Sequence, residues 1–221
     1  MIIVIGGVKG GTGKSTLAAN VTALLAADEH RVLLVDADDQ GSSSDWVNQR
    51  EALEIPTDWT TVRLTGAAVR SQVDKLKANY DYIIVDVGGR DTTSQRAALT
   101  IADVFVAPFQ PRSLDVWTLS MVSEIVDDAK IINPKLRAHT VLNRADSIGS
   151  DNSSALEILS EISQMPPLDV VIKQRKAFSN AIANGLSVFE VKGNKDKKAI
   201  EEIVQFKESL VNGHSAIAKA G

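Results

Sequence analysis

The chain has 221 residues, of which 44% are hydrophobic and 24% are charged, the balance of an ordinary globular protein. It contains no cysteine, which excludes disulfides, thiolate zinc sites, cysteine nucleophiles and cysteine-held iron–sulfur clusters. The formal net charge of −4 by itself argues against a nucleic-acid partner. The amino-terminal apolar run is short and has no basic residue before it, and no stretch approaches the roughly 18 apolar residues of a membrane span. We therefore expect a cytoplasmic protein without a signal peptide.

Short runs rich in valine and isoleucine alternate along the chain with longer segments of helical periodicity. In chain order, the expected elements are strand Ile2–Ile5, helix Ser15–Ala27, strand Arg31–Val35, a weaker strand Thr60–Leu64, helix Ala67–Lys77, strand Tyr82–Val85, strand Val104–Pro108, helix Leu114–Ala129, strand His139–Asn143, helix Ser153–Ile162, strand Val170–Ile172 and helix Lys197–Val211. This order predicts an α/β fold, with a mostly parallel, twisted sheet of about seven strands and helices on both faces. We expect residues 1–221 to form a single domain with a mobile tail at 212–221.

A glycine-rich segment at residues 8–16, Val-Lys-Gly-Gly-Thr-Gly-Lys-Ser-Thr, separates the first expected strand from the first helix. Glycines let successive backbone N–H groups turn toward a polyphosphate, and the start of the helix offers its positive dipole end to the same anion. At the end of the segment, Lys14 is expected to reach the β- and γ-phosphates, and the Ser15 hydroxyl is expected to ligate Mg²⁺. The segment therefore predicts a loop that binds a polyphosphate together with Mg²⁺.

Acidic residues end two of the expected strands. Asp36 and Asp38 lie two residues apart, so on an extended chain they project to the same side, toward the edge at which open α/β sheets bind ligands. Asp86 ends an apolar run in the Walker B arrangement, in which an aspartate holds Mg²⁺ through water and hydrogen-bonds the phosphate-loop hydroxyl. A pair of surface turn aspartates is the alternative interpretation of Asp36 and Asp38.

The glycine-rich segment departs from the standard pattern G-x-x-x-x-G-K-[ST], because Val8 occupies the first glycine position. It matches K-G-G-x-G-K-[ST] instead, with an additional lysine at Lys9, and so resembles the deviant Walker A motif of the ParA/MinD family of P-loop NTPases. The resemblance implies a Mg²⁺-dependent ATPase that forms a nucleotide-sandwich homodimer. Lys9 would then reach the partner's phosphates and act like an arginine finger. A solvated loop lysine is the alternative for Lys9.

The resemblance also gives roles to residues at other strand ends. By similarity to the family's D-x-D-P-Q-G segment, Asp36 is expected near Mg²⁺, and Asp38 is expected to orient the attacking water. Asn143 and Arg144 resemble a strand-end pair that lies beside the adenine, and an asparagine can both donate to and accept from a base edge. An ordinary turn asparagine is the alternative. The expected nucleotide-binding residues are Lys9, Gly10, Gly11, Thr12, Gly13, Lys14, Ser15, Thr16, Asn143 and Arg144. The expected catalytic residues are Lys9, Lys14 and Asp38, and the expected metal site comprises Ser15, Asp36 and Asp86.

Further segments extend the resemblance over residues 2–205. Gln110–Trp117 resembles the Q-P-S-x-x-D-x-W stretch of small ParA proteins, and Arg175–Phe178 with Gly185–Val188 resembles their R-x-A-[FY] and G-x-S-V signatures. Two places depart from the family's pattern. Asp39 replaces a proline, and Gly88-Gly89 replaces a proline-containing turn after the Walker B aspartate, so we expect a more flexible turn there.

Basic residues concentrate near the carboxyl terminus. Residues 1–169 contain 15 Lys and Arg against 23 Asp and Glu, whereas residues 170–221 contain 9 against 5. Proteins that bind DNA without sequence preference need several basic groups placed to neutralise phosphates, and the resemblance implies that ATP-bound dimers use such groups to bind the nucleoid. The candidate DNA-binding residues, in the basic segment 173–198, are Lys173, Arg175, Lys176, Lys192, Lys195, Lys197 and Lys198. A solvated basic face that aids solubility is the alternative.

The leading hypothesis is a small ParA-type partition ATPase, cytoplasmic and nucleoid-associated. It would form an ATP-dependent homodimer, bind nonspecific DNA, and hydrolyse ATP when stimulated by a ParB-like or other cargo-bound partner; the cargo would be a plasmid, a chromosome or a protein assembly. The first strand starts at residue 2, so we expect no amino-terminal helix-turn-helix module. A MinD-like membrane-cycling ATPase is disfavoured because residues 212–221 contain one isoleucine and no aromatic residue. A metabolic ATP-dependent ligase of the same fold would not need Lys9.

Overall fold

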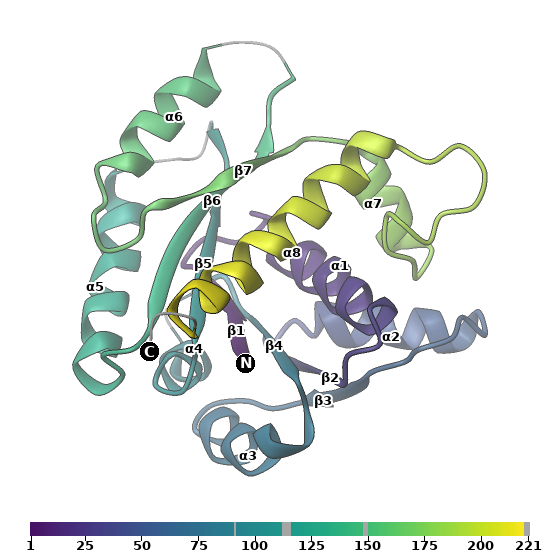
Figure 1. The fold of residues 1–221 in the computed structure, drawn as a ribbon, viewed down its shortest axis with the longest axis horizontal. Helices are drawn as coiled ribbons and strands as arrows, with labels where there is room; N and C mark the ends of the chain where they lie inside the picture. The colour runs from purple at the N-terminus through teal and green to yellow at the C-terminus, as the bar shows by residue number, and fades with distance from the viewer. Residues whose placement is uncertain (91, 112–115, 148–149, 219–221) are drawn as a thin grey trace.

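A parallel β-sheet lies at the centre of the molecule, with helices on both of its faces (Figure 1). The computed structural model describes residues 1–221 except 91, 112–115, 148–149 and 219–221. Within these residues the strands are β1 (Ile2–Ile5), β2 (Val32–Ala37), β3 (Thr60–Arg63), β4 (Tyr82–Val87), β5 (Val104–Phe109), β6 (Arg137–Ala145) and β7 (Pro167–Lys173). They pair in the order β3-β2-β4-β1-β5-β6-β7, and every pair is parallel. The predicted sheet is confirmed.

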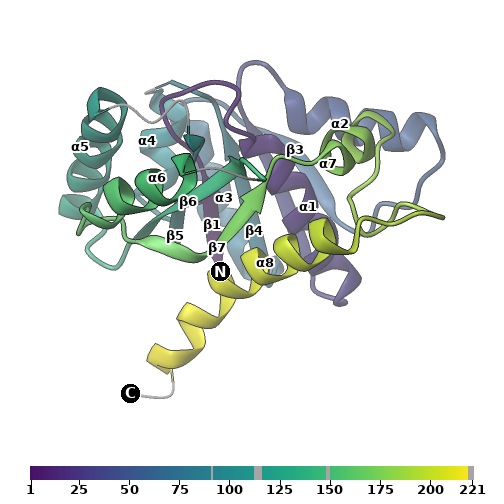
Figure 2. The same ribbon diagram turned by 90° about the horizontal axis from the view of Figure 1, so that it is seen from above.

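Helices connect the strands and cover the sheet. They are α1 (Lys14–Ala27), α2 (Ser42–Ala52), α3 (Ala68–Leu76), α4 (Thr93–Leu99), α5 (Val116–Ile132), α6 (Asp151–Ser160), α7 (Lys176–Ala183) and α8 (Lys197–Ala218), with a 3₁₀ turn at Lys77–Asn79. The apolar side chains of α3, α4, α5 and α6 pack on one face of the sheet, and those of α1, α2, α7 and α8 pack on the other. In Figure 1, α8 crosses this second face beside α1, and in Figure 2 its last turns extend away from the sheet. None of the described helices is long and apolar enough to span a bilayer.

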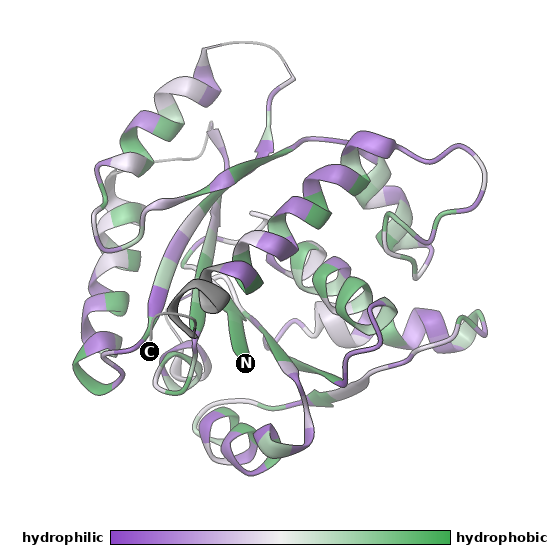
Figure 3. Cartoon of the chain, in the orientation of Figure 1, coloured by the Kyte–Doolittle hydropathy of each residue, from purple (hydrophilic) through white to green (hydrophobic). Residues whose placement is uncertain are grey.

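Burial on both faces explains why the strands are apolar throughout. Along β1, Ile2 and Val4 belong to one core, and Ile3 and Ile5 belong to the other, because successive side chains of a strand point to opposite faces. All four are at most 5% exposed. Figure 3 shows β1 in hydrophobic colours, whereas α8 alternates between hydrophobic and hydrophilic residues, as expected for a helix with one face toward water.

The structure adds three helices that the sequence pattern did not predict. These helices, α2, α4 and α7, are too short or too polar to show a full helical stripe of apolar residues. At the carboxyl terminus, α8 continues past the expected end at Val211 to Ala218, and residues 219–221 of the expected tail lie outside the described residues. The expected start of one helix at Leu114 also lies outside them; that helix is α5.

Candidate nucleotide-binding site

The carboxyl ends of neighbouring strands bring the predicted residues together. β1 leads into the phosphate loop, β2 contains Asp36, and β4 contains Asp86. In the sheet register, Asp86 pairs with Asp36 on one side and with Ile5 of β1 on the other. Because these strands are parallel, their carboxyl ends meet at one edge of the sheet. Two carboxylates therefore lie close to the start of the phosphate loop.

The phosphate loop has a conformation that requires glycine. Gly11 and Gly13 have φ angles of 76° and 92°, in the left-handed region that other residues rarely adopt. A Cβ atom on Gly13 would also collide with Asn143, whose Nδ2 donates a hydrogen bond to the Thr12 carbonyl at 2.7 Å. The helix that follows, α1, begins at Lys14 with no side-chain cap and no acidic residue in its first turn. Its first N–H groups and its dipole therefore suit an anion.

Lys14 is almost completely buried beside this loop, at 6% exposure. Its Nζ donates a hydrogen bond to the Lys9 carbonyl at 3.0 Å, which closes the loop across its base. Burial lowers the pKa of Lys14, and the nearby carboxylates of Asp86 and Asp38 offset only part of that effect. A buried ammonium of this kind gains strongly from a phosphate oxygen within hydrogen-bonding reach.

Asp86 is fully buried in the same site. Burial raises the pKa of Asp86 to about 7, although the hydroxyls of Ser43 and Ser15 donate hydrogen bonds to it. Ser43 Oγ lies 2.7 Å from Asp86 Oδ2, whereas Oδ1 has no hydrogen-bond partner among the described residues. A buried carboxylate oxygen without a partner, near the Ser15 hydroxyl, fits the needs of a hydrated Mg²⁺ ion.

Asp36 is equally buried, but both of its oxygens are engaged. Oδ2 accepts a hydrogen bond from the Ser44 N–H at 2.7 Å, and Oδ1 accepts one from the Asp38 N–H at 3.2 Å. Asp36 therefore anchors the start of α2 and shapes the loop that carries Asp38. No cluster of three or more acidic or histidine side chains suited to a metal occurs in the described part of the chain. A cation here would take most of its ligands from water and phosphate, as Mg²⁺ usually does.

A cavity of about 680 Å³ opens beside these groups. Its walls include the phosphate loop, the β2–α2 loop with Asp38 and the β4–α4 loop with Arg90. A smaller cavity of about 50 Å³ shares Gly13 and Arg144 with it and is bordered by Asn143 and Phe178. Arg144 has a φ of 52°, a left-handed conformation that is costly for arginine and is typical of functional sites. The two cavities together have the size of a small-molecule site.

The turn after Asp86 packs tightly against the rest of the site. A Cβ atom on Gly89 would lie 2.7 Å from the Gly10 nitrogen, and one on Gly88 would lie 2.9 Å from Asp38 Oδ1. Gly89 has no room for a side chain because its neighbours are backbone atoms, whereas a side chain at Gly88 would have to displace the Asp38 carboxylate. Close approach therefore accounts for the two glycines that depart from the family's pattern.

Two glutamines, which the sequence analysis gave no role in the site, hold the phosphate loop from outside. Gln95 is fully buried, and its Oε1 accepts a hydrogen bond from the Gly7 N–H at 2.8 Å. Gln110 Nε2 donates to the Gly11 carbonyl at 2.7 Å. Gln110 opens the stretch that resembles small ParA proteins, of which residues 112–115 lie outside the described residues.

The sequence analysis also missed Ser43, Ser44 and Arg90. The two serines lie within six residues after Asp38, and the arginine directly follows Gly88-Gly89. Their position near a recognised motif was the available signal in the sequence, but neither motif predicts that neighbouring residues contribute to the site.

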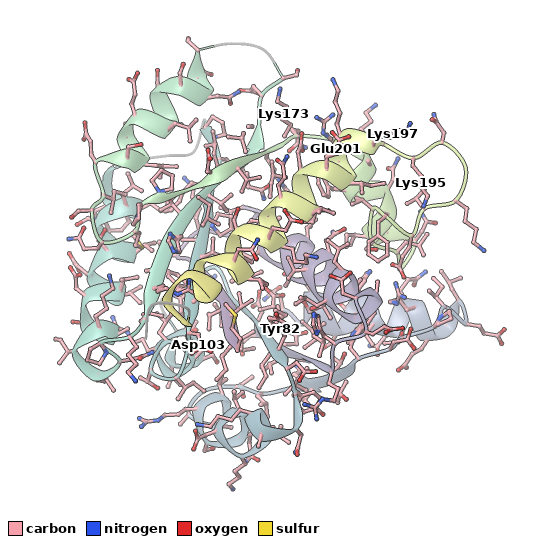
Figure 4. The ribbon with its side chains drawn as sticks, in the orientation of Figure 1. Tyr82, Asp103, Lys173, Lys195, Lys197 and Glu201 are labelled. Carbon is pink, nitrogen blue, oxygen red and sulfur yellow. The ribbon has the colours of Figure 1, made fainter. Side chains whose placement is uncertain are left out.

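The predicted basic segment lies at the other side of the smaller cavity, around the junction of β7, α7 and α8. In Figure 4, Lys173, Lys195 and Lys197 lie near the start of α8, with Tyr82 and Asp103 toward its other end. Five lysines are exposed and one, Lys173, is half-buried: the exposed ones are Lys176, Lys192, Lys195, Lys197 and Lys198.

Arg175 differs from these lysines because it is neutralised within the protein. Its guanidinium bonds Glu202 at 2.6 Å, and this hydrogen bond raises the pKa of Arg175. Asp196 lies 3.7 Å away. We therefore leave Arg175 out of the DNA-binding set that is proposed below.

Comparison with known proteins extends these observations. Residues 3–188 match the CobQ/CobB/MinD/ParA nucleotide binding domain. The maintenance of carboxysome distribution protein A of Halothiobacillus neapolitanus is 30% identical over 216 residues, which cover 95% of each chain. Two solved structures share the fold at 18% identity and a TM-score of 0.77: a complex of a Cyanothece McdA variant with ATP, matched over 95% of both chains, and a putative plasmid partition protein from Borrelia burgdorferi bound to AMPPNP, matched over 96% of this chain and 98% of that one. The chain therefore belongs to the CobQ/CobB/MinD/ParA family of nucleotide-binding proteins.

Proposed function

We propose that this protein is a ParA-type ATPase that positions cargo through an ATP-dependent cycle of dimerisation and DNA binding. The observation that carries the proposal is the meeting of Lys14, Ser15 and Asp86 beside a polar cavity that Asp38 also lines. Mg²⁺–ATP needs these groups: a buried cation for its phosphates, a hydroxyl and a carboxylate for the hydrated metal, and a carboxylate near the water that attacks. In this proposal, residues 1–221 work as one nucleotide-binding domain.

Each residue would act mainly by position and charge. The backbone N–H groups from Lys9 to Thr16 wrap the phosphates, and Lys14 neutralises charge as it develops during transfer. Ser15 and Asp86 would hold a hydrated Mg²⁺, which would supply positive charge beside the phosphate oxygens. Asp38 orients the attacking water, and Asp36 keeps the Asp38 loop in place through its bond to the Asp38 N–H.

Asn143 and Arg144 would bind one edge of the base at the border between the larger and the smaller cavity. Because Asn143 Nδ2 already donates to the Thr12 carbonyl, the Oδ1 atom remains as an acceptor for an amino group of the base. One side chain would thus fix the phosphate loop and orient the base.

Lys9 would act on the nucleotide of a second copy of the chain. Its backbone is held at two points, since Lys14 bonds its carbonyl and Gly89 approaches its carbonyl carbon. A cation supplied by a partner stabilises the transferring phosphoryl group. Hydrolysis would therefore depend on dimerisation.

The exposed lysines of the basic segment would contact DNA phosphates. Lys197 and Lys198 lie in the first turn of α8, directly after Asp196, whose carboxylate accepts a hydrogen bond from the Ala199 N–H at the positive end of the helix dipole. A DNA phosphate would interact favourably with the two exposed lysine side chains. A dimer presents two such segments, and affinity rises with the number of phosphates neutralised, so DNA binding and nucleoid association would follow the nucleotide state.

A ParB-like protein or another cargo adaptor would stimulate hydrolysis and release the dimer from DNA. The relative from Halothiobacillus neapolitanus, named for carboxysome distribution, matches nearly the full length of both chains. This match supports a protein assembly as the cargo class.

The test compares nonspecific duplex DNA binding with ATP, with ADP and without nucleotide, at one fixed salt concentration, together with Mg²⁺-dependent ATP hydrolysis. Wild-type protein and Lys75→Ala, an exposed position on α3 away from the site, should bind DNA only with ATP. Lys9→Ala should lose ATP-dependent dimerisation or hydrolysis. A Lys9→Ala variant that hydrolyses ATP at the wild-type rate would refute the sandwich dimer. Equal DNA binding with ATP, with ADP and without nucleotide would refute the cycle. ATP-dependent sedimentation with lipid vesicles would favour a membrane-cycling ATPase instead.

A further inference from the structure

We propose that Arg90 binds the terminal phosphate of ATP and lets the site distinguish ATP from ADP; this inference rests on the proposed function. Arg90 lies on the β4–α4 turn and lines the larger cavity. Its side chain is exposed, and no hydrogen bond or ion pair engages it within the described residues. An arginine that borders a polar cavity of this size is available to an anionic ligand.

The two cavities determine which way a nucleotide lies. Asn143 and Phe178 border the smaller cavity, whereas Asp38 and Arg90 line only the larger one. Gly13, at the start of α1, borders both. With an edge of the base toward the smaller cavity and the phosphates at the start of α1, the end of the triphosphate extends away from Asn143. It therefore reaches the part of the site that holds Asp38 and Arg90.

The turn that carries Arg90 is fixed by close contacts. Gly88 packs on Asp38 Oδ1, and Gly89 packs on the backbone of Lys9 and Gly10, each too closely for a Cβ atom. Arg90 thus follows a backbone segment that touches both the phosphate loop and the residue expected to orient water. A terminal phosphate bound to Arg90 would hold the phosphate loop and Asp38 in one arrangement. Release of that phosphate after hydrolysis would remove the contact that links them.

The charges of the cavity support this assignment. Among the described lining residues, the basic side chains are Lys14, Arg90 and Arg144, and the acidic ones are Asp38 and Asp39. Arg144 also borders the smaller cavity, which places it toward the base, and Lys14 belongs to the phosphate loop. Lys14 also lies near Asp38, so Arg90 is the described arginine of the lining that is not shared with the smaller cavity. Its planar guanidinium can bond two oxygens of one phosphate at once.

The test measures the affinities of Arg90→Ala, Arg90→Lys and Arg70→Ala for Mg²⁺–AMPPNP and for Mg²⁺–ADP by calorimetric titration. Arg90→Ala should bind AMPPNP about 10- to 100-fold more weakly and ADP within about 2-fold of wild type, because only the terminal phosphate loses a charge-assisted partner. The AMPPNP affinity of Arg90→Lys should lie between those of wild type and Arg90→Ala, because a lysine ammonium cannot bond two oxygens of one phosphate as a planar guanidinium can. Arg70, exposed on α3 and outside the cavity lining, is the matched control and should behave as wild type.

The ADP arm shows at the same time whether each variant folds. Equal losses for AMPPNP and ADP would overturn the proposal, because the effect would not concern the terminal phosphate. Unchanged AMPPNP affinity in Arg90→Ala would overturn it as well. Wild-type protein that binds neither nucleotide would overturn the proposed function itself, and that result is read before any variant is compared.

Discussion

The ion pair between Arg50 of α2 and Glu190 provides a sharp test of how this fold is held together. Arg50 is 1% exposed, and its Nη1 and Nη2 atoms lie 2.8 Å from Glu190 Oε2 and Oε1. Glu190→Ala removes the counter-charge and leaves a buried guanidinium with the carbonyls of Gly185 and Pro56, a long contact to Thr57 and the faces of two tryptophan rings, but no anion. Breaking a buried pair in this way costs about 3–5 kcal/mol, and the 22% exposure of Glu190 places the expected loss near 3 kcal/mol.

Thermal unfolding measures the effect directly. For a chain of this length, about 3 kcal/mol lowers Tm by about 6–12 °C. Asp74→Ala is the matched control, because it breaks the Lys77–Asp74 pair, whose side chains are 56% and 57% exposed. Exposed pairs contribute less than about 1 kcal/mol. If Glu190→Ala lowered Tm no more than Asp74→Ala, the reasoning from burial would be refuted.

The same pair predicts a pH dependence. Burial opposes ionisation of Glu190, but hydrogen bonds from Arg50 and Ser187 outweigh it and hold the pKa of Glu190 below its usual value. The unfolded chain therefore binds this proton more tightly than the folded protein does. The stabilisation is present above the unfolded pKa of about 4.3 and is lost as the pH falls through the lower folded pKa. The stability difference between wild type and Glu190→Gln should shrink over that acidic range.

Three further predictions concern the site and the basic segment. Gly89→Ala should weaken ATP binding by at least about 10-fold in a nucleotide titration, because its Cβ would displace the Gly10 backbone; unchanged affinity would contradict the close packing. Asp86→Asn should flatten the pH dependence of the free energy of unfolding in nucleotide-free protein. Burial raises the pKa of Asp86 to about 7, so this residue contributes stability that is fully present below about pH 4 and is lost as the pH rises to 7. Chemical denaturation at several pH values measures this dependence. Replacing Lys192, Lys195, Lys197 and Lys198 by alanine should reduce the slope of log affinity against log salt by up to about 7 for a dimer on duplex DNA, while Arg70→Ala/Lys75→Ala on α3 should leave the slope unchanged.

Local spacing was sufficient to predict the centre of the site. The glycines, Lys14 and Ser15 of segment 8–16 are close together in the sequence. The segment alone therefore predicts a phosphate-binding loop that is followed by a helix. Asp36 and Asp86 could be placed beside it because parallel strands end at the same edge of a sheet. No distant contact had to be known for these predictions.

Contacts between distant segments could not be predicted in this way. Gln110 reaches the Gly11 carbonyl across nearly half the chain, and no pattern near Gln110 specifies that contact. Arg175 was counted as a free charge because a count of basic residues does not show their partners, and its neutralisation by Glu202 depends on how α8 packs beside β7. Charge patterning therefore predicted the basic segment but not which of its members is available to DNA.

The helix α2 shows the same limit in its strongest form. Its interior has too few apolar residues for a helical stripe, so periodicity does not predict it. Polar contacts add to the packing of its two buried apolar residues: at its start, Ser43 bonds Asp86, and near its end Arg50 bonds Glu190 and stacks 5.2 Å from the ring of Trp46. Two of these partners lie on other segments of the chain, and they can hold the helix only once those segments are folded. The intrinsic propensity of a polar helix is a weak guide when tertiary contacts stabilise it. Local sequence therefore could not predict α2, although this helix joins the buried carboxylate of Asp86 to Glu190.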